Sequence, residues 1–229
     1  MTEANDQERV EAACRALYNE VGRLWQGKKL TYPTWELGYS ILYSPPRYRP
    51  ELLMIGENPG SDVGQQYSDS EHAGWPDYNS YHRDTYRLAL KLQSLFGQIQ
   101  AMDILQDSVG FNMNFFRSRP SGAKDVGFRW KDNPSPIQIE LEEFCRTKVL
   151  QLIELMQPKL IVTLGFKAFA SIVAGPGVTL EHRPSSCLCL CDHIRSIPVL
   201  GIIHPTGSHV SGSDWSRIMK RIQNRLRRG

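Results

Sequence analysis

The sequence contains no apolar run that approaches the length needed to span a bilayer. Its polar first residues lack the basic and apolar regions of a signal peptide. Cysteine is also scarce: the five present form an odd number and lack the spacing of a disulfide framework. These absences predict an intracellular protein with free thiols and no membrane partner, located in the cytoplasm or the nucleoid if the source is bacterial.

A linker is missing as well, because no Gly/Ser-rich stretch or run of like charges divides the 229 residues. Internal repeats and low-complexity segments are absent too. With 41% hydrophobic and 22% charged residues, the composition is that of an ordinary soluble globular protein. We expect one monomeric domain over 1–229, with an N-terminal amphipathic helix over 6–25 capped by Asp6, a core over 51–213 and a basic helix over 214–228.

Three of the cysteines, Cys187, Cys189 and Cys191, alternate along one short stretch. On a strand they would share a face, and three thiols on one face could bind a metal ion. Such a site usually draws on a Cys-x-x-Cys pair, which the sequence does not contain. Because buried thiols also pack as small apolar residues, we favour packing over metal binding for this stretch.

The net charge of +3 and the isoelectric point near 8.6 permit binding to nucleic acid without requiring it. Basic residues gather at 215–229, where six of them surround an apolar line of Ile218, Ile222 and Leu226. This pattern predicts an amphipathic helix with a basic outer face. The face is either solvated, with its cations stabilised by the helix dipole, or directed at phosphates.

One apolar stretch ends in the turn Gly56-Glu57-Asn58-Pro59-Gly60. Residues 52–55 are continuously apolar and too few for a helix, which predicts a strand buried on both faces. In open α/β sheets, ligands bind beyond the carboxyl ends of strands, and glycines let the backbone approach a ligand. By itself, such a turn is more often a plain connection between elements than a site.

Two further segments carry residues that a plain core does not need. The stretch 61–81 is long and polar but contains four aromatic residues, which favours a lid or recognition loop over disorder. The predicted strand over 108–116 includes Asn112 and Asn114, whose side chains would point the same way. Because buried amides need partners, either both bond nearby backbone or one of them faces a ligand.

Apolar runs over 159–165 and 197–203 predict two more strands. Helical periodicity separates the strands, and the predicted helices are 84–96, 136–155 and 166–173. The alternation predicts an α/β fold, a three-layer sandwich with a central, mainly parallel four-stranded sheet flanked by helices. Residues 187–192 are expected to form a strand that pairs near 197–203.

The carboxyl ends of parallel strands meet at one edge of a sheet. Asn58 follows the first predicted strand, Asn114 lies on the second and His204 follows the last. Residues far apart in the sequence should therefore share one pocket.

Four segments, in order, resemble motifs of the uracil-DNA glycosylase superfamily over residues 51–213. The Gly56 turn resembles the first motif, in the Gly-x-Asn-Pro-Gly version of the single-strand-selective and mismatch-specific branches. Residues 111–120 resemble the second-strand segment of the thermostable branches, with Asn114 at the base-reading asparagine. Residues 144–168 resemble the family's helix and its Pro-Lys-strand-Leu-Gly-x-x-Ala signature, and His204-Pro205-Thr206 resembles its His-Pro-Ser motif.

The resemblance implies a monofunctional DNA glycosylase of base-excision repair, which flips a deaminated base, most simply uracil, out of DNA and hydrolyses its N-glycosidic bond. The implied catalytic residues are Asn58, which would hold water, and His204, which would donate to the base. The implied base-binding residues are Gly56, Pro59, Asn114, Tyr81 for stacking and Tyr67 as the second choice. The implied DNA-binding residues are Arg117, Lys167, Thr206, Gly207, Ser208 and His209. The family chemistry needs no metal and no organic cofactor.

The sequence departs from the family in its chemistry. Asn58 cannot act as a base at neutral pH, where other branches carry an aspartate, so it could only position water. Only Cys145 matches the four cysteines of the iron–sulfur branches, and Ser118 replaces another, so we expect no cluster. Residues 207–213 offer only His209 and Val210 as bulk for a wedge, which predicts weak activity on duplex DNA.

Two alternatives stay open. The first is a member of the same fold that binds nucleic acid or a nucleotide without cleaving it. The second, an unrelated α/β nucleotide-binding enzyme, would need a glycine-rich phosphate loop, which the sequence does not contain.

Overall fold

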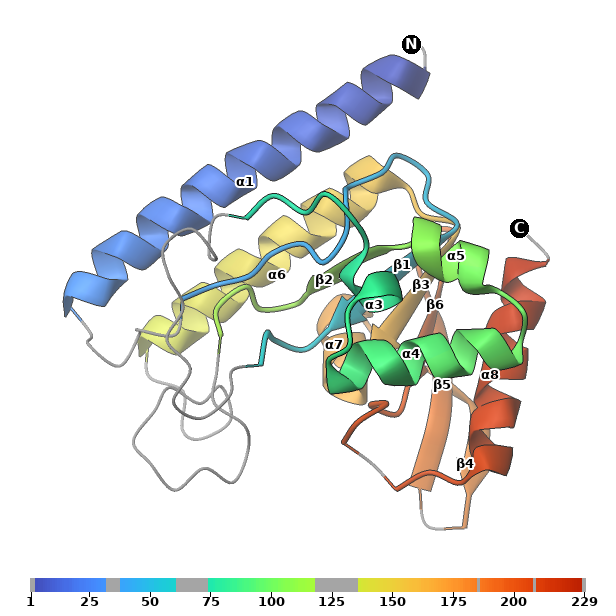
Figure 1. Ribbon diagram of the computed structural model, residues 1–229. Helices are drawn as coiled ribbons and strands as arrows, with labels where there is room; N and C mark the ends of the chain where they lie inside the picture. The colour runs from blue at the N-terminus through green and yellow to red at the C-terminus, as the bar shows by residue number, and fades with distance from the viewer. Residues whose placement is uncertain are drawn as a thin grey trace.

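A six-stranded mixed sheet runs through the protein, with strand order β2-β1-β3-β6-β5-β4 (Figure 1). The computed structural model describes residues 3–31, 38–60, 74–117, 136–184, 186–207 and 209–227. The strands are β1 (Leu52–Gly56), β2 (Val109–Asn112), β3 (Leu160–Leu164), β4 (Val178–Arg183), β5 (Ser186–Ile194) and β6 (Ile197–Ile202). The α/β class is as predicted.

The predicted number of four strands is wrong. β2, β1, β3 and β6 pair in parallel and are the four predicted strands. β5 pairs antiparallel with β6, as expected for residues 187–192, and β4 extends the sheet antiparallel to β5. β4 escaped prediction because its six residues contain no apolar run, and the one that is buried is a charged residue, Glu181.

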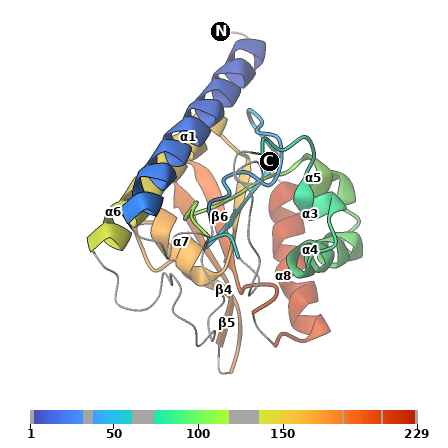
Figure 2. The same ribbon diagram turned by 60° about the vertical axis from the view of Figure 1, so that its left-hand side comes forward.

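Helices cover both faces of the sheet and complete three layers (Figure 2). α1, α6 and α7 pack on one face, and α4, α5 and α8 pack on the other. The bounds are α1 (Glu3–Thr31), α3 (Ser80–Arg83), α4 (Arg87–Gln98), α5 (Met102–Asp107), α6 (Pro136–Met156), α7 (Phe166–Ile172) and α8 (Gly212–Leu226). None of the helices in the described ranges is long and apolar enough to cross a membrane.

α1 is longer than the predicted helix over 6–25, because it begins at Glu3 and continues to Thr31. Asp6 therefore lies in the first turn, where it forms an ion pair with Arg9 at 3.2 Å, and does not cap the helix. A stripe of apolar residues at helical spacing packs into the core beside α6: Val10, Cys14, Leu17, Val21 and Trp25. The rest of the helix surface carries its charges, as expected for an amphipathic helix.

The segment 38–44 lies along the outer side of β2 without forming a full strand. Isolated antiparallel bridges join Tyr39 to Phe116 and Leu42 to Phe111. The Tyr43 N–H donates to the Gly110 carbonyl at 2.8 Å. This pairing brings a tyrosine from an irregular stretch to the strand that ends in Asn112.

Candidate functional site

The carboxyl ends of the four parallel strands form one continuous edge. Gly56 at the end of β1 pairs with Asn112 at the end of β2, and Leu164 of β3 pairs with Ile202 of β6. Neighbouring strands lie about 4.8 Å apart, so the edge spans about 14 Å from β2 to β6. The residues that follow these strands, including Asn58 and His204, are therefore gathered at one edge, as expected.

Asn112 is the asparagine that the fold holds most firmly at this edge. Its side chain is buried and donates from Nδ2 to the Tyr43 hydroxyl at 3.0 Å. Its Oδ1 lies against Gly56, where an added Cβ would come within 2.1 Å of it. Glycine is thus required at position 56 because the Asn112 amide occupies the space that a side chain would take.

Asn114 lies two residues beyond β2 and is half-buried. Its backbone N–H donates to the Glu57 carbonyl at 2.9 Å, which ties the segment after β2 to the turn after β1. In that turn, the Asn58 side chain donates from Nδ2 to the Pro59 carbonyl at 3.0 Å, and Pro59 is buried. Both asparagines expected from the sequence are therefore at the edge, together with Asn112.

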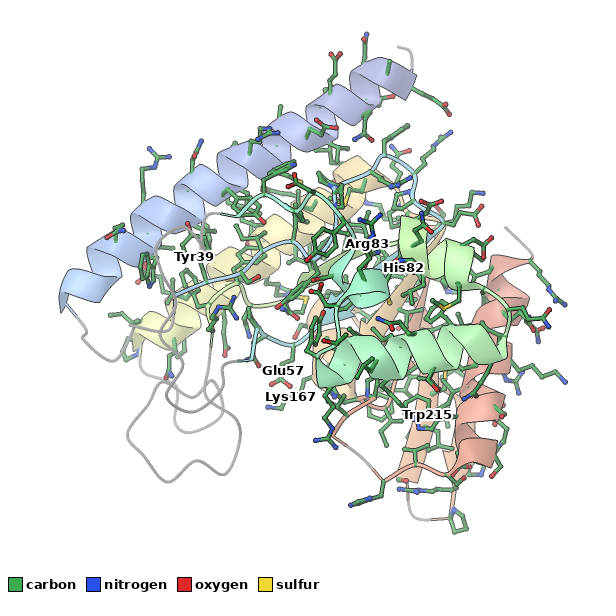
Figure 3. All side chains as sticks on the ribbon, in the orientation of Figure 1. Tyr39, Glu57, His82, Arg83, Lys167 and Trp215 are labelled. Carbon is green, nitrogen blue, oxygen red and sulfur yellow. The ribbon has the colours of Figure 1, made fainter. Side chains whose placement is uncertain are left out.

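The turn after β1 also carries a carboxylate that the sequence interpretation passed over. Glu57 forms an ion pair with Lys167, at the start of α7, with 3.3 Å between Nζ and Oε1 (Figure 3). Burial raises the pKa of Glu142 on α6; the Lys167 charge opposes this rise, and the Glu57 charge adds to it. The acidic second residue of the turn motif was the signal that could have identified Glu57.

His204 follows β6 by two residues and is half-buried. The Thr206 N–H donates to His204 Nδ1 at 3.3 Å, and the Thr206 hydroxyl lies 3.2 Å from the same nitrogen. Because Nδ1 accepts, the neutral ring carries its proton on Nε2. His204 is therefore prepared as a donor through Nε2.

Two glycines lie beside this histidine at ordinary van der Waals distance. Gly165 has a φ of +111°, which side-chain-bearing residues rarely adopt, and its Cβ position lies 3.8 Å from the His204 ring. Gly207 also lies against the ring, with its Cβ position 3.6 Å from Nδ1. The turn after β3 and the loop after β6 thus enclose His204 from two sides.

Tyr81, which we expected to stack on an extruded base, lies inside the core with 1% of its surface exposed. Its ring stacks on Tyr43, with 5.3 Å between centroids and 10° between planes, and it contacts β2 at Gly110. The Tyr81 ring fills the space left by Gly110, where it makes more packing contacts than it would if it pointed outward. Tyr81 therefore supports the half-buried Tyr43. The sequence did not indicate a role for Tyr43, because it lies in an irregular, proline-rich stretch. Tyr67 lies outside the described residues.

The residues expected to contact DNA are spread around the edge. Arg117 donates to the Gly60 carbonyl at 3.1 Å, and Lys167 remains largely exposed beside Glu57. His209 is exposed, and its carbonyl accepts from Arg183 at 3.0 Å. Thr206 and Gly207 contact His204 itself, and Ser208 lies outside the described residues.

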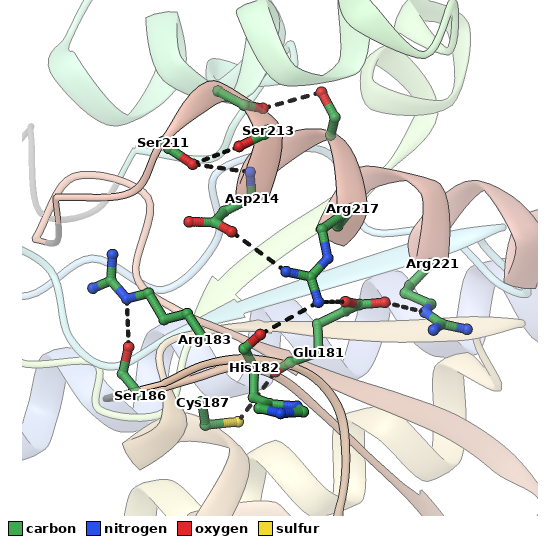
Figure 4. A network of polar contacts seen from close by, with 12 residues as sticks. Glu181, His182, Arg183, Ser186, Cys187, Ser211, Ser213, Asp214, Arg217 and Arg221 are labelled. Atoms are coloured by element: carbon green, nitrogen blue, oxygen red, sulfur yellow. Dashed lines mark hydrogen bonds and ion pairs between the residues drawn. The ribbon is translucent and has the colours of Figure 1, made fainter.

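Two cations of the basic helix α8 form ion pairs with another part of the protein. Glu181 of β4 is buried and accepts from Arg221 Nε at 2.7 Å and from Arg217 (Figure 4). Arg217 also donates to the His182 carbonyl at 3.3 Å and approaches Asp214. Part of the basic face is thus structural, and phosphate binding by the remaining cations stays a prediction.

The cysteines of β5 pack as side chains of the sheet. Cys189 is buried, Cys187 and Cys191 are half-buried, and all five cysteines of the chain are unpaired thiols. Across the described ranges, no group of three or more His, Cys, Asp or Glu side chains could hold a metal ion.

A cavity of about 360 Å³ lies between α1 and α6, lined by residues that include Asp6, Arg9, Tyr48 and Gln157. Tyr48 precedes β1 and Gln157 precedes β3, so this cavity belongs to the amino edge of the sheet. It is therefore separate from the edge that carries the asparagines and the histidine.

No family model matches the sequence, and no curated protein matches it either.

Proposed function

We propose that this protein is a monofunctional DNA glycosylase that removes a deaminated base, most simply uracil, from DNA. The observation that carries the proposal is the meeting, at one sheet edge, of buried Asn112, the Gly56 turn and a histidine whose Nδ1 accepts a hydrogen bond. The resemblance in sequence supports the same activity. The proposed chemistry uses side chains of this chain alone.

The base must leave the DNA stack before such an edge can reach it. Extruding a nucleotide costs roughly a few kcal/mol, and contacts to the strand must offset that cost. Lys167 is exposed and Arg117 is half-buried, and both lie at the edge, where they can contact phosphates. Asn58, Asn114 and His204, at the same edge, are half-buried.

An asparagine amide would recognise the extruded base. An amide offers one acceptor and donors, so it can pair with O4 and N3–H of uracil, whereas cytosine presents the reverse pattern. Asn114 is the residue expected from the sequence, and Asn112 is a second candidate because its amide is held between Gly56 and Tyr43. A held amide discriminates better because it cannot rotate to suit cytosine.

His204 would stabilise the departing base. The uracil becomes an anion as the bond breaks, so a donor aimed at O2 stabilises the transition state more than the ground state. Acceptance by Nδ1 from Thr206 favours the tautomer that can donate from Nε2. The loss of one such donor typically costs about 3 to 4 kcal/mol.

The attacking water would be held by the turn after β1. Asn58 can only orient water, but Glu57, in the same turn, is a carboxylate that can also attract its protons. Lys167 forms an ion pair with Glu57, which ties the turn to the start of α7. The turn thus combines an orienting amide with a charged acceptor.

Base release from short oligonucleotides tests the proposed activity. Single-stranded and duplex DNA, each with one uracil or hypoxanthine, would be incubated in EDTA and treated with alkali to reveal abasic sites. We expect metal-independent release from wild-type protein. Asn112→Ala and Asn114→Ala, compared with Asn224→Ala on the exposed surface of α8, would show which amide reads the base. No release by folded protein on any substrate would overturn the activity and favour a binding module.

A further inference from the structure

The described part of the chain exposes five large hydrophobic side chains, and three of them lie between residues 78 and 90. Tyr78 is 43% exposed, Tyr86 is 38% exposed and Leu90 is 50% exposed. The other two, Ile139 and Val178, lie on separate elements. Exposed aromatic residues that cluster on one segment commonly mark a binding surface.

The segment is firmly attached to the core, so its exposure is not a consequence of a loose chain. Asn79 is buried and donates to the carbonyls of Leu105 and Ser108 at 2.8 and 2.9 Å. The Tyr78 hydroxyl donates to Asp84 Oδ1 at 3.0 Å. A tyrosine that is held in place loses little conformational freedom when a ligand stacks on it.

Cations accompany the exposed rings. The Arg83 guanidinium lies 5.5 Å from the Tyr78 ring centre, and Arg87 is exposed in the first turn of α4. Neither arginine forms an ion pair with a carboxylate within the described ranges. The carboxylate of Asp84 accepts from the Tyr78 and Ser80 hydroxyls, and both arginine side chains are exposed. Figure 3 shows Arg83 beside His82 on α3.

The exposed rings are linked to the candidate site through Tyr43. Burial of the phenol is the main cause that raises the pKa of Tyr86, and the neighbouring Tyr43 phenol adds to the rise. Tyr43 in turn accepts from Asn112, at the end of β2. A DNA strand with one nucleobase at the edge of the sheet can therefore continue across residues 78–90.

We propose that Tyr78, Arg83 and Tyr86 form an aromatic surface that binds single-stranded DNA beside the base site. Stacking on aromatic rings combined with nearby cations is how proteins hold unpaired strands without reading their sequence. Bases in a duplex are already stacked and cannot use such rings, so the surface favours single-stranded DNA. This inference rests on the proposed function for its ligand, but binding can be measured without base release.

Fluorescence anisotropy of a labelled oligothymidine, which contains no damaged base, tests the surface. We expect Tyr78→Ala to raise the Kd for this strand about 5- to 150-fold, and Tyr86→Ala to act in the same direction. Tyr78→Phe keeps the ring and loses only the bond to Asp84, so its Kd should stay near that of wild type. Val178→Ala, at an exposed site on β4, is the matched control. Circular dichroism would check that each variant is folded.

Arg83→Gln provides a second variant that leaves both rings in place, and it should weaken binding and lower its salt dependence. A Kd within twofold of wild type for both Tyr78→Ala and Arg83→Gln would overturn the surface. Equal losses on oligothymidine and on duplex DNA would overturn the stacking role. Weaker binding by Tyr78→Ala, with no base release by wild type, would keep the surface and reject the glycosylase. Base release by wild type, with unchanged binding by Tyr78→Ala and Arg83→Gln, would keep the glycosylase and reject the surface.

Discussion

Gly56 shows how a single missing side chain shapes the candidate site. The position ends β1, and Oδ1 of the buried Asn112 fills the space where a Cβ would stand. Gly60, in the same turn, has no atom within 4 Å of its Cβ position. The packing around the motif therefore requires glycine at position 56 and leaves space for a side chain at position 60.

Gly56→Ala should displace the Asn112 amide and destabilise the protein by about 1 to 3 kcal/mol, because a buried and hydrogen-bonded side chain cannot move aside freely. Gly60→Ala should change the free energy of unfolding by less than about 0.5 kcal/mol. Urea denaturation of the two variants measures the difference. Equal midpoints for Gly56→Ala and wild type would show that Asn112 can move at little cost.

At the residue scale, the sequence located the turn after β1 and His204, because each follows a continuous apolar run that can only be a buried strand. It did not locate Tyr43, since no periodicity marks an irregular segment that pairs with β2 through backbone bonds. Tyr81 failed as a stacking residue for a related reason. Its burial depends on Gly110 in another strand, a contact that sequence spacing does not show.

At the scale of elements, the clearest feature is the contact of Glu181 on β4 with Arg217 and Arg221 on α8, which we call the clamp. Register shifts on both sides of Glu181 interrupt the pairing of β4 with β5. Burial alone would raise the pKa of Glu181, but the hydrogen bond from Arg221 and the charges of Arg217 and Arg221 hold the pKa below its ordinary value. The two arginines are partly exposed, so the clamp joins a buried anion to a solvated helix face.

A carboxyl group whose folded-state pKa is lowered stabilises the protein above its unfolded pKa, and that stability is lost as the pH falls through the lowered value. Glu181→Gln should therefore reduce the free energy of unfolding by about 1 to 3 kcal/mol near neutral pH. The difference from wild type should shrink below about pH 4. Urea midpoints across this range measure it.

Glu143→Gln is the control for the clamp, because Glu143 is largely exposed and lies 3.9 Å from Arg146. Its substitution should have little effect at any pH, as for most surface ion pairs. A Glu181→Gln variant as stable as wild type near neutral pH would mean that the charge of Glu181 does not hold α8 on the sheet.

Element prediction succeeded where burial is regular and failed where it is not. The buried runs of β1, β3 and β6 and the periodic faces of α6 and α8 were found close to their observed bounds. β4 was missed because five of its six residues are not buried, and the single buried one, Glu181, is charged. The four predicted strands of the parallel half were thus accessible from the sequence, and the antiparallel edge only in part.

At the scale of the whole molecule, the cysteines report on how completely the chain is folded. Burial raises the pKa of Cys14, Cys145 and Cys189 to about 12 in each case. Cys14 lies on α1, Cys145 on α6 and Cys189 on β5, so the three thiols sample both faces of the sheet and the N-terminal helix. Cys187 and Cys191 are only half-buried.

Native protein at about pH 8 should therefore react with a thiol reagent only at Cys187 and Cys191, because a thiol with a pKa of about 12 is ionised to the extent of about one part in ten thousand. All five cysteines should react after denaturation. Absorbance on labelling with DTNB counts them, and mass spectrometry identifies them. Rapid labelling of Cys14 in native protein would contradict the observed packing of α1.

The layered architecture follows from the alternation of apolar strands with amphipathic helices, which is why its class was predictable. What the alternation does not encode is the arrangement of side chains between layers, such as Tyr43 on Tyr81. The candidate site depends on both levels, since strand order gathers the edge, Tyr43 holds the Asn112 amide, and Thr206 in the loop after β6 holds the His204 ring.

The most direct test of the account is the rate of uracil release from single-stranded DNA under single-turnover conditions for His204→Ala. His193→Ala is the matched control, because His193 is exposed on β5 beside Pro198, at the amino end of β6. We predict a fall on the order of a hundredfold or more for His204→Ala, with the His193→Ala rate unchanged. A His204→Ala rate within about threefold of wild type would contradict the assignment of His204 as the group that stabilises the departing base.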